Sequence, residues 1–141
     1  MKKERKGSAI LEGALVMSTA MFMIIFVMEM GRFLMIQQWT SERARTVARM
    51  AAVNNWDQTA VGNVVCYNST TAPQGGGPGY MGLVPSEVTY ARLGSAGAAD
   101  DRVQVKIQNV PVLTWLPLIS GTYKLPPVVV TVPTQSLGAT N

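Results

Sequence analysis

An uncharged apolar stretch, residues 13–28, constrains the fold of this chain more than any other feature of its sequence. As a helix, its 16 residues cover roughly 24 Å, slightly less than the roughly 30 Å hydrocarbon core of a bilayer. Extension back to Ser8 gives roughly 31 Å, which is enough to span. The basic start is that of a secretory signal, but no small-x-small cleavage motif follows the apolar run. The sequence therefore predicts a retained single-pass anchor over about residues 8–31.

The excess positive charge of the chain lies beside this anchor. Residues 1–53 carry eight basic and four acidic side chains, whereas residues 54–141 carry four of each. Nucleic-acid binding requires a basic face on the folded domain, whereas basic residues beside an apolar segment orient that segment in a membrane. We therefore expect the lipid bilayer to be a partner, and no nucleic acid.

The residue types needed for common catalytic chemistry are missing. The chain has no histidine and a single cysteine, Cys66. An intrachain disulfide is therefore excluded, and the usual general base and metal ligand are absent. We expect a protein that is not an enzyme, with no catalytic residue, no metal site, no cofactor and no small-molecule substrate.

Glu12 places a carboxylate inside the anchor, at a cost of about 3 kcal/mol on insertion scales. It either snorkels to the membrane edge or requires a partner. The run Lys6-Gly7-Ser8-Ala9-Ile10-Leu11-Glu12 resembles the type IV prepilin processing site, in which a basic leader ends in Gly and Glu is the fifth residue that follows. The resemblance implies cleavage between Gly7 and Ser8 by a prepilin peptidase. Glu12 would then neutralise the new amino terminus of a neighbouring subunit.

A second, narrower resemblance covers about residues 6–52. The segments 29–32, 37–38 and 44–52 resemble the TadE-like family of minor pilins, or pseudopilins, from tight-adherence (Tad) pilus systems. Gly13 departs from the aromatic residue usual in that family, and Val47 from a common Gly.

The resemblance implies a structural minor pilin that takes part in assembly of a Tad-type IV pilus. Its implied partners are other pilin subunits, the prepilin peptidase, a platform membrane protein and, through it, an assembly ATPase. The implied location is the bacterial inner membrane, with a cytoplasmic N-terminus and a periplasmic C-terminal domain, and the cell surface after assembly. Two alternatives remain open: a pseudopilin of a type II secretion system, and an unprocessed membrane-anchored envelope adhesin or binding protein.

The helix is expected to continue beyond the membrane to about Ala52. Two stripes recur at helical spacing on opposite sides. The polar stripe is Gln38, Glu42, Arg45 and Arg49, and the apolar stripe is Ile36, Thr40, Ala44, Val47 and Ala51. Glu29 and Arg32 are three residues apart and can form an ion pair, which marks the membrane boundary or a contact between subunits.

Residues 53–141 follow the basic leader 1–7 and the helix 8–52 as a small α+β domain. We expect a helix over 58–65 with Asp57 as its N-cap, and a flexible loop over 70–82. Strands are expected over 87–93, 102–108 and 128–132, of which the middle one alternates strictly between apolar and polar residues. Asp100 and Asp101 are expected to be turn residues. Cys66 is expected to be a small buried side chain, with a contact between two chains as the alternative.

Residues 110–119 are apolar, contain two prolines and are expected to form a loop. This loop either covers the domain's own core or docks on another subunit or the bilayer, with Trp115 and Leu116 as its anchors. The complete expectation is an α+β, pilin-like fold. It has a long N-terminal helix that is transmembrane at its start, a short second helix and a small antiparallel β-sheet.

Overall fold

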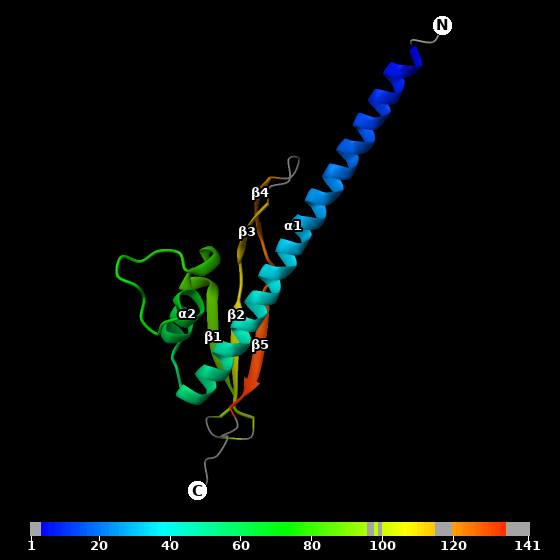
Figure 1. Ribbon diagram of the computed structural model, residues 1–141. Helices are drawn as coiled ribbons and strands as arrows, with labels where there is room; N and C mark the ends of the chain where they lie inside the picture. Colours follow the sequence, from blue (N-terminus) through cyan, green and yellow to red (C-terminus); the bar gives the residue numbers. More distant parts are fainter. Residues whose placement is uncertain (1–3, 96–97, 99, 115–119, 135–141) are drawn as a thin grey trace.

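The structure, a computed structural model, describes residues 4–95, 98, 100–114 and 120–134. Within them a long N-terminal helix and a short second helix accompany a small antiparallel sheet, which confirms the predicted α+β fold class (Figure 1). The helices are α1 (Glu4–Asn54) and α2 (Gln58–Tyr67), and two 3₁₀ turns follow, η1 (Tyr80–Gly82) and η2 (Pro85–Glu87). The strands are β1 (Val88–Leu93), β2 (Arg102–Ile107), β3 (Pro111–Thr114), β4 (Gly121–Lys124) and β5 (Val128–Pro133).

Helix α1 has two halves with opposite surroundings. Its 51 residues make a rod roughly 76 Å long, because the segment contains no proline. Residues 8–24 are exposed on every side, whereas the predicted apolar stripe from Ile36 to Ala51 is buried against the domain. The helix ends at Asn54, and the next residue, Asn55, has a φ of 50°, the left-handed conformation that commonly terminates helices.

Helix α2 is capped at both ends. The Asp57 side chain accepts a hydrogen bond from the Ala60 N–H at 2.8 Å, as predicted for an N-cap. The helix runs two residues beyond the predicted end, to Tyr67, and its C-cap, Asn68, is left-handed and donates its N–H to Val64 O. Because backbone groups at both ends of α2 are hydrogen-bonded, the loop that follows begins from a fixed position.

The main sheet has the order β1-β2-β5, and its neighbours are antiparallel. The alternation predicted for β2 is confirmed, since Val103, Val105 and Ile107 are at most 1% exposed. Their face packs on α1, so the hydrophobic core lies between the second half of that helix, α2 and the sheet.

Strands β2 to β5 form a single bent hairpin, here called the β-ribbon, with arms 102–114 and 121–133. Arg102 faces Pro133 and Ile107 faces Val128, and the same register continues in β3 and β4 from Pro111–Lys124 to Thr114–Gly121. Between the two ladders, Leu125 N–H still donates to Val110 O at 3.0 Å.

The expectation of a loop over residues 110–119 was therefore wrong for Pro111–Thr114, which form strand β3. Pro111 is the first residue of that strand, where its missing N–H is tolerated. The ladder is interrupted where Asn109 is left-handed, with φ of 59°, and where Pro126 and Pro127 cannot donate. The prolines thus bend the ribbon and do not end it.

The outer edge of β1 is closed by a side chain. The Gln58 amide donates to Val88 O at 2.6 Å and accepts from Tyr90 N–H, also at 2.6 Å. One glutamine thus takes the place of a neighbouring strand at this edge.

Candidate membrane and assembly surfaces

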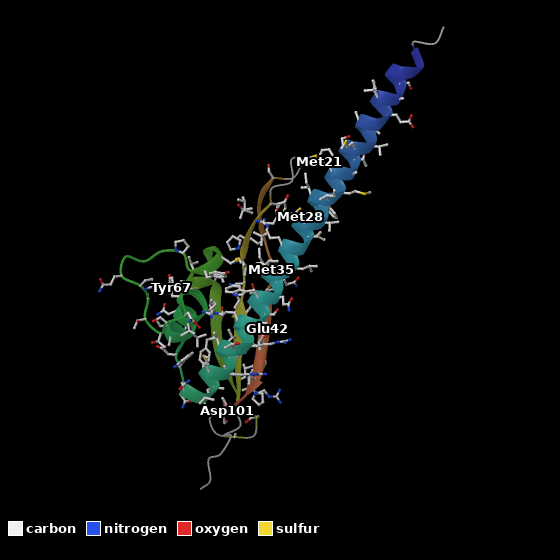
Figure 2. All side chains as sticks on the ribbon, in the orientation of Figure 1. Met21, Met28, Met35, Glu42, Tyr67 and Asp101 are labelled. Atoms are coloured by element: carbon white, nitrogen blue, oxygen red, sulfur yellow. The ribbon has the colours of Figure 1, made fainter. Side chains whose placement is uncertain are left out.

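The first surface is the exposed apolar half of α1. Every residue from 8 to 24 is exposed, and the large side chains there include Leu11, Leu15, Met17, Met21 and Met23, between 63% and 77% exposed. In Figure 2 the side chains before Met21 stand clear of every other element. Among the described residues, α1 from Ser8 onward is the one helix whose length and composition suit a membrane crossing. An apolar surface this large is compatible with a membrane anchor.

Glu12 lies within this surface. Its side chain is exposed, and within the described part of the chain it makes no hydrogen bond or salt bridge. Ser8 and Glu12 are four residues apart in α1, so they lie on the same helix face. The domain, which covers α1 only from Ile25 onward, does not cover Glu12.

The predicted processing site is helical. The Gly7–Ser8 bond lies near the start of α1, which begins at Glu4. A helix frays most readily in its first turn, because the first four N–H groups have no partner within the helix. The backbone there is among the easiest in α1 to unwind.

Glu29 and Arg32 form the predicted ion pair. Arg32 Nη2 donates to Glu29 Oε1 at 2.9 Å, and the Glu29 side chain is only 19% exposed. Ile25 and Glu29 are the first residues of α1 to be partly covered. The pair therefore lies where the free half of the helix meets the domain.

The predicted polar stripe of α1 is confirmed. Gln38, Glu42, Arg45 and Arg49 are all exposed, and Arg45 Nη1 lies 3.5 Å from Glu42 Oε1. Both partners of this surface pair are more than 60% exposed, so it contributes little to stability. The stripe leaves one side of α1 open opposite the sheet.

A shallow hollow of about 300 Å³ lies between α1 and α2, and the sequence did not indicate it. Its lining is Trp39, Arg43, Cys66, Tyr67, Asn68 and Tyr80. Arg43 reaches across to the end of α2, where Nη2 and Nε donate to the carbonyls of Val64 and Val65 at 2.8 and 3.3 Å. Val64 O also accepts the N–H of Asn68, whereas Val65 O is a terminal carbonyl of α2 for which the cation supplies a donor. The described residues that line the hollow include no carboxylate.

Cys66 is buried, as predicted, with 2% of its surface exposed. Desolvation by burial raises the pKa of its thiol to about 11, with a smaller contribution from the charge of Glu87. The reactive form of cysteine is the thiolate. A thiol that holds its proton this strongly is packed as a small apolar side chain and is a poor nucleophile.

Asp101 lies at the end of the predicted turn, where its N–H donates to Ala98 O at 3.1 Å, but the burial and pairing of its side chain were not predicted. Its side chain is 3% exposed and forms two hydrogen bonds with Arg92, at 2.9 and 2.6 Å, and these bonds raise the pKa of the guanidinium further above its ordinary value. Arg92 also donates to Asn55 Oδ1 at 3.3 Å. The ion pair therefore ties the base of the β-ribbon to the end of α1. Asp100, its neighbour, is exposed in the turn as predicted.

The remaining predicted positions, Trp115 and Leu116, lie outside the described residues. The other predicted positions lie in two separate places on α1: Gly7, Ser8 and Glu12 near its start, and Glu29 with Arg32 where the domain begins.

Within the described ranges, no group of three or more histidine, cysteine or acidic side chains is placed to hold a metal ion. In comparisons with known proteins, no family model, no curated protein and no solved structure matches this chain.

Proposed function

We propose that this chain is a structural, pilin-like subunit, a minor pilin or pseudopilin of a Tad-type IV pilus. It is held in the inner membrane by α1 and enters a helical assembly after its leader has been removed. The observation that carries this proposal is the position of Glu12, an exposed carboxylate without a partner of its own on an apolar helix. A simple anchor gains nothing from such a residue, because each copy carries the cost of about 3 kcal/mol alone.

Cleavage after Gly7 supplies the missing partner. It creates an α-amino cation at Ser8, in the same apolar layer as Glu12. In a bundle of parallel subunits, the Glu12 carboxylate of one copy neutralises the amino terminus of the next. Two opposite charges attract far more strongly in this medium than in water. The pair thereby fixes the axial offset between copies, as buried polar groups fix register in coiled coils.

The two halves of α1 have different roles in this proposal. The exposed apolar half moves from lipid into the bundle, where close helix packing replaces lipid contacts. The second half carries the domain on one side and leaves its polar stripe open on the other. The partners required are a prepilin peptidase, other pilin subunits, a platform membrane protein and, through it, an assembly ATPase. No cofactor takes part.

Two measurements test the proposal. Mass spectrometry of membrane-purified protein is expected to find a chain that begins at Ser8. Replacement Glu12→Gln is expected to lower incorporation into the assembly at least tenfold, which corresponds to about 1.4 kcal/mol per contact. The control is Glu42→Gln, which removes an exposed carboxylate from the polar stripe and is expected to assemble normally.

The outcomes separate the alternatives. An intact leader 1–7 together with unchanged incorporation of Glu12→Gln would refute the proposal and favour an unprocessed envelope adhesin or binding protein. Cleavage at Ser8 with co-purification of secretion components, and no pilus, would assign the subunit to a type II secretion system. In that case the processing chemistry is the same and only the apparatus differs.

A further inference from the structure

The free end of the β-ribbon reaches the level at which the apolar half of α1 ends. The base of the ribbon is level with the end of α1, since Arg92 bonds both Asp101 and Asn55. A fully extended arm from Arg102 to Thr114 rises roughly 40 Å, which is an upper bound for the bent ribbon. The same distance along α1 corresponds to roughly 26 residues, which leads from Asn54 back to about Met28.

The burial along α1 and the picture of the fold agree with this estimate. Ile25 and Glu29 are the first partly covered residues of α1, and Met28 is the last residue of the uncharged stretch. Figure 1 shows β3 and β4 continuing beside α1 toward its N-terminal end. If α1 crosses a bilayer as proposed above, the end of the ribbon lies at the surface of that bilayer.

Near this end the ribbon exposes large side chains on both of its faces. Val112 is paired with Tyr123 and Leu113 with Thr122. Paired residues share a face and successive residues alternate, so Leu113 and Tyr123 point to opposite faces. Leu113 is 52% exposed and Tyr123 is 46% exposed, although Val112, the cross-strand partner of Tyr123, is only 3% exposed.

Exposure on both faces indicates which kind of partner covers them. A docking protein surface covers one face of a two-stranded ribbon, whereas the interfacial layer of a membrane surrounds its end. Tyrosine suits that layer, because its ring is apolar and its hydroxyl stays hydrated. Lys124, next to Tyr123, is exposed and can reach anionic headgroups.

We propose that the end of the β-ribbon rests in the interfacial layer of the bilayer that α1 enters, with Leu113 and Tyr123 as its contacts. The domain then touches the membrane at two points, the helix and the ribbon, and its tilt relative to the bilayer is fixed. This inference rests on the membrane anchor of the proposed function.

The test measures the depth of nitroxide labels on the full chain in vesicles of phosphatidylcholine and phosphatidylglycerol. Labels are attached to Leu113→Cys and Tyr123→Cys in a Cys66→Ala background. Thr131→Cys, exposed on the same ribbon far from its end, is the aqueous control, and Val16→Cys reports the anchor. Near-ultraviolet circular dichroism checks that each variant is folded. Both end labels are expected to be shielded from a water-soluble nickel chelate at least threefold relative to Thr131, and to collide more often with oxygen.

Each other result overturns the inference in a distinct way. End labels as open to nickel as Thr131, with Val16 shielded, refute the second contact and leave the anchor intact. Shielding of only one end label, or dipolar broadening between end labels that disappears on dilution with unlabelled protein, assigns the surface to a second copy. A label at Val16 that is open to nickel refutes the anchor and, with it, this inference.

Discussion

Substitution of Gly79 by alanine tests how the loop after α2 is held on the core. A Cβ atom at Gly79 would lie 2.5 Å from the carbonyl oxygen of Cys66 and 2.6 Å from its Cβ. Ordinary contacts begin near 3.4 Å, so one side must move by roughly 1 Å. Cys66 is fixed within α2 and is 2% exposed. We therefore expect the loop to move.

The size of the effect follows from the bonds that this movement breaks. Gly79 N–H donates to Leu83 O at 2.6 Å, and Gly79 O accepts from Gly82 N–H at 3.0 Å. Each is worth about 1 kcal/mol, and overpacking of a core costs about 1 to 3 kcal/mol. Gly79→Ala is expected to lower the free energy of unfolding by about 2 kcal/mol, or Tm by about 10 °C in a domain of this size.

The assay is thermal and urea unfolding of the full chain in detergent micelles, followed by near-ultraviolet circular dichroism. Gly77→Ala is the matched control, since a Cβ at Gly77 meets no atom within 4 Å. That control is expected to keep or slightly raise stability, because alanine lowers the entropy of the unfolded chain. Equal stability of Gly79→Ala and the parent protein, or an equal loss in both variants, would refute the packing of this loop on Cys66.

Two further predictions concern the edge of the sheet and the buried thiol. Gln58→Glu keeps an acceptor for Tyr90 N–H but cannot donate to Val88 O, so we expect this variant to be about 1 kcal/mol less stable in urea than Thr59→Glu. Thr59→Glu is the control, because it adds the same charge to the start of α2. Equal stabilities of the two variants would contradict the role of Gln58. The folded Cys66 thiol keeps its proton up to about pH 11, whereas the ordinary pKa is 9.0. Burial of the neutral thiol therefore stabilises the fold fully below pH 9. As the pH rises toward 11 the free energy of unfolding falls by about 2 to 3 kcal/mol. Cys66→Ala should lack this component in pH-dependent unfolding, and an identical pH profile for the two proteins would argue against a thiol held neutral by burial.

The parts of the fold predicted from sequence are those set by local periodicity. The stripe from Ile36 to Ala51, the Asp57 cap and the alternation of β2 each follow from residues within a few positions of one another. The Glu29–Arg32 pair was predictable for the same reason. These features depend on helix or strand geometry alone.

The features that were missed depend on residues far apart in the sequence. Pro111 and its neighbours resemble a loop until β4 is known to pair with them. The burial of the Asp101 side chain was not predicted, because its partner, Arg92, lies on β1, on the other side of the turn. Arg43 and Gln58 are polar residues with no local sign that they bond to the end of α2 and to the edge of β1. Such contacts form only when the tertiary structure brings the partners together.

The prolines around β5 have a consequence for aggregation. This strand, Val-Val-Val-Thr-Val-Pro, has no charge and forms an edge of the described sheet, and such segments stack readily into cross-β fibrils. Pro126 and Pro127 precede it and Pro133 ends it, so the edge that can recruit a foreign strand is limited to six residues. Gln58 closes the opposite edge at Val88 and Tyr90, so β5 is the edge of this sheet at which a foreign strand can pair, and its flanking prolines limit the length of that pairing. In the assembly proposed above, where copies would lie close together, this limit lowers the tendency of neighbouring sheets to pair.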